Sequence, residues 1–202
     1  MRVRPIAPED VKALTDVMSG AFKGTPDERP RARVAKYLLD QLEPDPEEVC
    51  LVAVLSGDDD EEEKKGQEKN YGGEPVGLVS LSFTGEARGG DAAKSKSGPG
   101  SIPCPPDAAY LCNMAVAKAH RGKGVAKALL RACDDLVSRM GGVDVWLHVR
   151  MGDAIAFGLY VGGGYEVEAR ESKLALMFSR DKQGVALMRK ELVPEGVNAY
   201  FG

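Results

Sequence analysis

The stretch Tyr110-Leu-Cys-Asn-Met-Ala-Val-Ala-Lys-Ala-His-Arg-Gly-Lys-Gly-Val-Ala-Lys-Ala-Leu-Leu130 decides the fold of this chain. It begins as an apolar run that is typical of a buried strand and then turns through Lys118 to Gly124. A helix is predicted from Val125 to Gly141-Gly142, because apolar residues recur at helical spacing. These residues are Val125, Leu129, Ala132, Cys133, Leu136 and Met140. A strand that leads through a glycine turn into a helix can bind phosphate, because the first helical N–H groups have no intrahelical acceptor and the helix dipole favours an anion.

The glycine turn does not match two common phosphate-binding motifs. The dinucleotide motif G-x-G-x-x-G would need a glycine where Lys127 stands, and the Walker motif is absent. The run Arg121-Gly122-Lys123-Gly124-Val125-Ala126 fits the pattern [Q/R]-x-x-G-x-[G/A]. It resembles the pyrophosphate loop of the GCN5-related N-acetyltransferases (the GNAT superfamily), which bind coenzyme A. A basic glycine turn can also be an ordinary solvated turn, so its interpretation depends on a second motif.

The second motif lies between Leu147 and Tyr165 and resembles the family segment L-x-V-x-x-x-N-x-x-A-x-x-[LF]-Y-x-x-x-G-[FY]. The residues in register are Leu147, Val149, Ala156, Leu159, Tyr160, Gly164 and Tyr165. Asp153 stands where the family usually has Asn. Both motifs occur in the family's order and at its separation, so the chain resembles a GNAT acetyltransferase.

The order of predicted elements is β-α-α-β-β-β-α-β-α-β-β. Together with the resemblance it implies an α/β fold with a mixed, mostly antiparallel sheet of six to seven strands, helices on both faces and a splayed central strand pair. We expect residues 1–202 to form a single N-acetyltransferase domain. Two polar stretches, at about 57–73 and 85–107, are expected to be flexible insertions within it, because they contain too few apolar residues to offset the cost of ordering.

Composition narrows the functional classes. The 202 residues are 43% hydrophobic and carry a net charge of −4, which gives no reason to expect nucleic-acid binding. The sequence has no apolar run long enough for a membrane helix and no signal-peptide core at its start. We therefore expect an intracellular protein that is cytoplasmic or organellar, with a plastid as an option if a targeting segment has been removed. The sequence does not indicate an oligomeric state.

The four cysteines lack C-x-x-C spacing, and only two histidines accompany them, so we expect no metal site. Cys50, Cys112 and Cys133 lie in apolar patterns and are expected to be buried free thiols, whereas Cys104 does not.

The resemblance implies acetyl-CoA as the cosubstrate. The N–H groups from Gly122 to Ala126 would surround its pyrophosphate, with Lys123 and Lys127 adding positive charge. Asp153 is expected to cap a short helix from Ala154 to Val161, which Gly162-Gly163-Gly164 would end. Its carboxylate keeps the helix cap but loses the amide donor of the usual Asn. The expected cofactor-binding residues are Met114, Ala115, Val116, Arg121, Gly122, Lys123, Gly124, Val125, Ala126, Lys127, Asp153, Ala156 and Tyr160.

Tyr160 occupies the family position of the general acid. A phenol with a pKa of about 10 can protonate a departing thiolate with a pKa of about 8.5 without a large perturbation. His148 is a candidate base. Its strand neighbours Leu147 and Val149 should point to the opposite face of the sheet, so if they are buried, His148 points to the side where Tyr160 and the substrate are expected. The Leu-His-Val sequence, with Tyr110 leading the central strand, is closest in motif to the protein N-terminal (N-alpha) acetyltransferases. In that family a His and a Tyr in these places handle the amine proton through water.

The predicted acceptor is a primary amine. At pH 7 an α-amine costs about 1.4 kcal/mol to deprotonate and a lysine about 4.6 kcal/mol, which favours protein N-termini over lysine side chains. The N-terminal acetyltransferases usually carry a tyrosine pair after the strand that follows the short helix, but residues 173–178 contain no tyrosine. A polyamine, an aralkylamine or a similar small amine therefore stays open as the acceptor, as does a coenzyme A-binding protein without catalysis. Phe22 and Tyr37, in the helical region that overlies the acceptor in the superfamily, could contact substrate or simply pack between helices.

Overall fold

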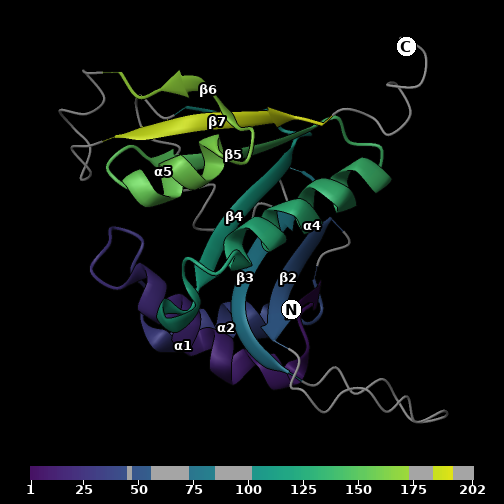
Figure 1. Cartoon of the computed structure of the whole chain (residues 1–202), viewed down its shortest axis with the longest axis vertical. Coiled ribbons are helices and arrows are strands. Elements are labelled where there is room, and N and C mark those ends of the chain that lie inside the picture. Colours follow the sequence, from purple (N-terminus) through teal and green to yellow (C-terminus); the bar gives the residue numbers. More distant parts are fainter. Residues whose placement is uncertain (45–46, 56–72, 85–101, 173–183, 193–202) are drawn as a thin grey trace. The chain divides into compact units, whose positions relative to one another are not determined.

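Seven strands within the described residues form one hydrogen-bonded sheet in the order β1-β2-β3-β4-β5-β7-β6. The computed structural model describes residues 1–44, 47–55, 73–84, 102–172 and 184–192 (Figure 1). The strands are β1 (Arg2–Pro5), β2 (Glu48–Leu55), β3 (Glu74–Ser82), β4 (Ala109–Val116), β5 (Asp144–Arg150), β6 (Glu166–Arg170) and β7 (Val185–Glu191). Strands β4 and β5 are parallel, whereas the pairs β1–β2, β5–β7 and β6–β7 are antiparallel. The predicted mixed α/β sheet is confirmed.

The pairing of β4 with β5 is short. It covers three residue pairs and ends at Leu111 and Leu147, although β4 continues to Val116 and β5 to Arg150. This early end of the ladder is the splayed central pair that the resemblance implies.

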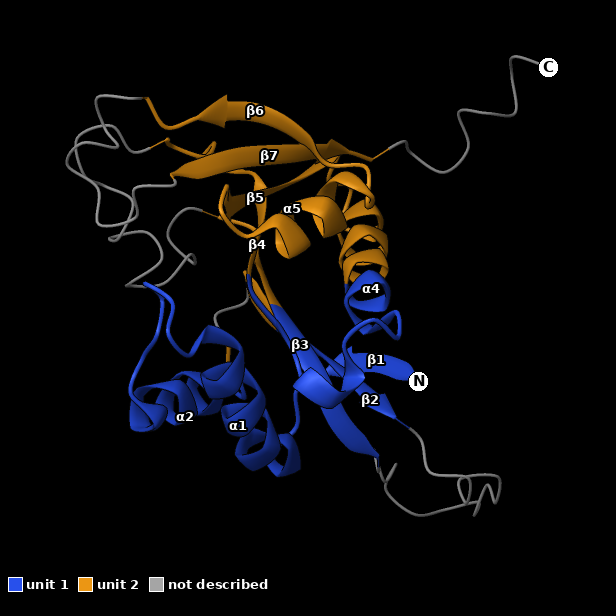
Figure 2. Cartoon of the chain, turned by 60° about the vertical axis from the view of Figure 1, so that its left-hand side comes forward, with its two compact units in different colours: residues 1–43, 50–79, 113–129 blue, residues 44–49, 80–112, 130–202 orange. Residues whose placement is uncertain are grey.

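The chain divides into two compact units (Figure 2). One contains residues 1–43, 50–79 and 113–129, and the other contains residues 44–49, 80–112 and 130–202. Residues 57–72 and 85–101 of the predicted insertions lie outside the described residues, as do residues 173–178. Residues 102–107, which were predicted to belong to the second flexible insertion, are described, and the Ile102 and Pro105 carbonyl oxygens make hydrogen-bond contacts with His148 Nε2 and Ala108 N.

In the first unit, helices α1 (Val11–Phe22) and α2 (Arg31–Asp40) pack on one face of the strands. Their shared core consists of Leu14, Met18, Val34, Leu38, Cys50, Val52, Val54, Leu78 and Ala115. The start of α1 is held by a buried ion pair between Arg4 and Asp10, in which Asp10 Oδ2 also accepts a hydrogen bond from Ala7 N at 2.8 Å. The carboxylate thus satisfies a backbone donor at the helix entry.

The opposite face of the same strands carries the first turn of α4 (Val125–Arg139). Successive strand residues point to opposite faces, so Gly77 faces α4 while Leu78 faces α1 and α2. A Cβ placed on Gly77 would lie 3.0 Å from Val125 Cγ1 and 3.1 Å from Ala115 O. The helix start therefore packs directly on the backbone of β3.

The predicted apolar face of α4 needs a correction. Val125, Leu129 and Cys133 are buried as expected. Leu130 and Val137, which were not among the predicted residues of this face, are buried as well. Met140 is 57% exposed, because the helix ends at Arg139 and Gly141 turns the chain with a φ of +81°.

In the second unit, α5 (Ala154–Val161) lies next to β5 and begins and ends where the sequence predicts. Leu147 and Val149 of β5 are 1% and 5% exposed, whereas His148 between them is half-buried.

All four cysteines belong to the described residues, and none of them forms a disulfide. Cys50 and Cys133 are buried, but Cys112 is only partly buried, contrary to expectation, because it directly follows the last β4–β5 pair.

None of the helices in the described residues is long and apolar enough to cross a lipid bilayer. In the same part of the chain, no three His, Cys, Asp or Glu side chains are grouped in a way that could hold a metal ion.

Candidate active site

The glycine turn before α4 has the backbone of an anion-binding nest. Gly122 and Gly124 adopt φ angles of +75° and +84°, a region that other residues rarely occupy. The residue between them, Lys123, does not share this conformation. Such alternation points successive N–H groups toward a common point, where an anion can be bound.

The start of α4 is open to solvent. Arg121, Gly122, Lys123 and Gly124 are all exposed, and no atom lies within 4 Å of a Cβ placed on either glycine. The first helical hydrogen bond runs from Ala128 N to Gly124 O at 3.0 Å, so the preceding N–H groups have no helical acceptor. The predicted pyrophosphate loop is thus accessible and rich in donors. The Arg121 side chain turns back instead, and its Nε donates to Val116 O at 3.2 Å.

The end of β4 contains a feature that the sequence analysis missed. Asn113 has a φ of +54°, and among the described residues no other non-glycine residue has a positive φ. Asn tolerates this left-handed conformation better than most residues, so an Asn within the apolar strand was the sequence feature that could have indicated it. The extended backbone is therefore interrupted just before Met114, Ala115 and Val116, which are expected to hydrogen-bond the pantetheine arm.

Tyr110 and His148, the two residues that the resemblance assigns to the amine proton, lie side by side. The Tyr110 hydroxyl is 2.8 Å from His148 Nδ1, and the two ring centroids are 5.7 Å apart. His148 Nε2 is 2.9 Å from the carbonyl oxygen of Ile102, a contact that sequence reasoning did not anticipate. Tyr110 is 4% exposed, whereas His148 and Ile102 are partly buried.

Tyr160 lies near the end of α5 and is 8% exposed. Its ring meets that of Tyr165 edge to face, with centroids 5.7 Å apart. Burial raises the pKa of Tyr160 well above its ordinary value, and the carboxylate of Asp153 adds to this effect. The expectation of an ordinary pKa is wrong. The hydroxyl stays protonated at neutral pH, and the raised pKa makes it a weaker acid toward a departing thiolate than an ordinary phenol.

Asp153 caps α5 as predicted. Its Oδ1 accepts a hydrogen bond from Ala156 N at 2.9 Å. Two residues that the resemblance places at the cofactor are therefore bound to each other in this structure.

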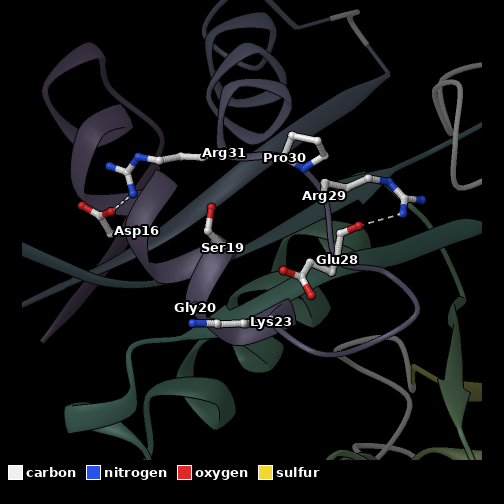
Figure 3. A pocket seen from close by; sticks show the side chains of 8 residues that line it. All are labelled: Asp16, Ser19, Gly20, Lys23, Glu28, Arg29, Pro30 and Arg31. Carbon is white, nitrogen blue, oxygen red and sulfur yellow. Dashed lines mark hydrogen bonds and ion pairs between the residues drawn. The ribbon is translucent and has the colours of Figure 1, made fainter.

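Phe22 and Tyr37 pack against the core of the first unit, as the packing alternative predicted. A hollow of about 560 Å³ lies nearby, over the outward face of α1 and the loop that leads to α2 (Figure 3). It is lined by Asp16, Ser19, Gly20, Lys23, Glu28, Arg29, Pro30 and Arg31. None of the predicted site residues belongs to it, so we do not assign it to the active site.

The glycine turn and most of the second motif fall within one family match. The model described as Acetyltransferase (GNAT) family matches residues 22–162. The chain belongs to this family of acetyltransferases. The GNAT relative "GCN5-related N-acetyltransferase 5, chloroplastic" of Arabidopsis thaliana is 33% identical over 167 residues, which are 81% of this chain and 48% of that protein. The chain therefore spans about half the length of that curated relative.

Solved acetyltransferase structures share the GNAT fold of this chain. The structure of yncA from Salmonella typhimurium with acetyl-CoA is 21% identical, with a TM-score of 0.60 and coverage of 96% of this chain and 94% of that one. The structure of Arabidopsis thaliana NAA60 in complex with a bisubstrate analogue is 17% identical, with a TM-score of 0.62 and coverage of 96% and 98%. The fold class predicted from the motifs is confirmed.

Proposed function

We propose that this chain is an acetyl-CoA-dependent N-acetyltransferase that transfers the acetyl group directly to a primary amine. The preferred acceptor is a protein N-terminal α-amine, and lysine side chains are slower acceptors. The observation that carries the proposal is the hydrogen bond of 2.8 Å between Tyr110 and His148, which provides a proton acceptor in a chain of the GNAT family.

Acetyl-CoA is held by the exposed amides from Gly122 to Ala126, whose left-handed glycines suit a pyrophosphate. Lys123 and Lys127 are exposed beside these amides and contribute positive charge. Met114, Ala115 and Val116 supply backbone groups for the pantetheine arm, and a backbone N–H near Val116 donates to the oxyanion. Acetyl-CoA supplies the thioester, and no metal is required.

Three side chains divide the proton transfers. His148, with Tyr110, removes a proton from the acceptor ammonium, and this step matches the ordinary pKa of an α-amine better than that of a lysine. Tyr160 keeps its proton at neutral pH and gives it to the departing thiolate. General acid or base groups of this kind typically contribute about 10²–10⁴-fold to the rate.

The test is incubation of the protein with acetyl-CoA and a peptide library, followed by mass spectrometry to locate the acetyl group. Acetylation at peptide N-termini, with a strongly reduced kcat in Tyr160→Phe, supports the proposal. Tyr165→Phe is the matched control, because it removes a buried hydroxyl that has no hydrogen-bond partner among the described residues. Modification of polyamines or aralkylamines alone would favour the small-amine alternative. Acetyl-CoA binding without turnover, and with identical behaviour of Tyr160→Phe, would favour a non-catalytic module.

We also propose that residues 1–202 act as a single acetyltransferase domain and that its compartment is the plastid, as in the name of the Arabidopsis relative. Limited proteolysis with and without acetyl-CoA tests the first statement. Microscopy of a fluorescent fusion of the whole gene product tests the second.

A further inference from the structure

We propose that the carbonyl group of Ile102 fixes the tautomer of His148 and thereby makes the Tyr110 hydroxyl the group through which the acceptor's proton reaches the histidine. The inference rests on the proposed function, because it names the proton path of the same reaction. Ile102 is a positioning residue, and Tyr110 is the catalytic residue that faces the proton donor.

The tautomer follows from two hydrogen-bond contacts that the imidazole nitrogens make. A backbone carbonyl oxygen can only accept a hydrogen bond, so the contact of 2.9 Å between Ile102 O and His148 Nε2 requires a proton on Nε2. In the neutral ring Nδ1 then carries a lone pair. The Tyr110 hydroxyl, 2.8 Å away, donates to that lone pair.

The direction of proton movement follows from the same contacts. A carbonyl oxygen has no proton to pass on, so a proton cannot reach the ring by way of Ile102. A phenol can accept a proton at its oxygen while its own proton moves to Nδ1. The N–H bond of the acceptor ammonium breaks, an O–H bond forms at Tyr110, the former Tyr110 O–H bond breaks and an N–H bond forms at Nδ1. The products are a neutral amine and an imidazolium ion, and charge and protons balance.

The resulting imidazolium keeps both of these hydrogen bonds. Nε2–H still donates to Ile102 O, and Nδ1–H now donates to the Tyr110 oxygen. Because Tyr110 is 4% exposed and His148 is half-buried, these bonds are stronger than they would be in water. The buried neighbours Leu147 and Val149 hold the strand and therefore the imidazole ring in place.

The segment that carries Ile102 is built to hold its carbonyl in one direction. Pro103, Pro105 and Pro106 follow it. Each proline fixes its own φ, and a residue that precedes a proline is restricted to extended conformations. Ala108 N also donates to Pro105 O at 3.3 Å. A segment with so little freedom loses little entropy when it binds His148.

The tautomer can be read directly by NMR. The chain has two histidines, so protein labelled with ¹⁵N-histidine gives two imidazole spectra, and His120 serves as an internal control. For His148 we expect one protonated nitrogen at Nε2 and one unprotonated nitrogen at Nδ1. A Nδ1–H tautomer, or rapid averaging of both tautomers, would overturn the inference whether or not the protein is an active enzyme.

Two variants test the proton path. Tyr110→Phe should keep the Nε2–H tautomer and lower kcat by about 10²–10⁴-fold with little change in KM for acetyl-CoA. Pro103→Ala releases the restriction on Ile102 and should shift the ¹⁵N pattern toward averaging and reduce kcat, whereas Pro44→Ala, at an exposed proline, should change neither. If the wild-type protein is active and Tyr110→Phe keeps full activity, the proton relay is contradicted but the proposed function is not. Absence of transfer to any amine contradicts the proposed function and the relay with it.

Discussion

The Nζ atom of Lys190 on β7 lies 2.6 Å from Oδ2 of Asp134 on α4, and the two residues are separated by 56 positions in the sequence. The side chains of Lys190 and Asp134 are 25% and 14% exposed. Desolvation raises the pKa of Asp134, and this effect exceeds the opposing effect of the hydrogen bond from Lys190. The pKa of Asp134 is therefore raised even though its carboxylate is paired with Lys190 in an ion pair that joins a helix to a strand.

Replacing both partners should be better tolerated than replacing one. Asp134→Asn leaves Lys190 without its carboxylate, and we expect a loss of about 1–3 kcal/mol in the free energy of unfolding. The double variant Asp134→Asn/Lys190→Met should recover most of this loss. Urea denaturation at pH 7 measures both effects. If the double variant loses as much free energy of unfolding as Asp134→Asn and Lys190→Met together, the two side chains are not coupled.

Alkaline pH should reveal the buried tyrosines of the second unit. Burial raises the pKa of both Tyr160 and Tyr165, so the folded state keeps their protons when the unfolded state has lost them. Their contribution to stability is complete below about pH 10 and is lost as pH rises above that value, at about 1.4 kcal/mol per pH unit for each tyrosine.

Between about pH 10 and 11 the free energy of unfolding should therefore fall less steeply with pH in Tyr165→Phe than in the wild type, by the contribution of one proton. At pH 8 the variant and the wild type should have parallel slopes, which is the control. At neutral pH the variant should be at least as stable as the wild type, because it loses a buried hydroxyl without a partner. Equal slopes above pH 10 would contradict the raised pKa of Tyr165.

Gly124→Ala should weaken acetyl-CoA binding and cost about 1 kcal/mol of stability, because the φ of +84° at this position strains an alanine. Gly20→Ala is the matched control. Gly20 lies within α1 at a negative φ with no atom within 4 Å of an added Cβ, so alanine should stabilise by about 0.4–1 kcal/mol. Calorimetry with acetyl-CoA and thermal unfolding measure the two properties. Unchanged acetyl-CoA affinity in Gly124→Ala would argue against the nest.

Asp153 allows the helix cap to be separated from ligand binding. Asp153→Ala removes the hydrogen bond to Ala156 N and should cost about 1 kcal/mol, whereas Asp153→Asn preserves a good capping residue and should cost little. Under the proposed function, Asn also restores an amide donor and removes a negative charge near an anionic cosubstrate, so its Kd for acetyl-CoA should fall. A Kd that rises in Asp153→Asn would indicate that the carboxylate itself is required.

Local chemistry explains which parts of the fold could be predicted from sequence. Asp153 caps the start of α5 through a hydrogen bond from Ala156 N, only three positions further along the sequence, and α5 begins and ends as predicted. Alternation along β5 was enough to separate His148 from Leu147 and Val149. Both predictions depend on neighbours in the sequence, where backbone geometry leaves few choices.

The missed features depend on contacts that sequence spacing does not encode. Ile102 meets His148 across 46 positions, and nothing in an Ile-Pro pair indicates an acceptor for an imidazole. The left-handed backbone of Asn113 lies within an otherwise ordinary apolar strand pattern. The pKa of Tyr160 depends on the burial of its own side chain, and the periodicity of a short apolar helix does not show which of its residues is buried.

Strand β3 has little room at Gly77, where an added methyl group would lie 3.0 Å from Val125 Cγ1 and 3.1 Å from Ala115 O. An alanine there requires its neighbours to move by a few tenths of an ångström, and a larger residue would press further on Val125, the first residue of α4. Under the proposed function, coenzyme affinity should therefore respond to substitutions in the interior of the sheet, and a search for variants with altered acyl-donor preference should include this concealed position alongside the lysines at the surface.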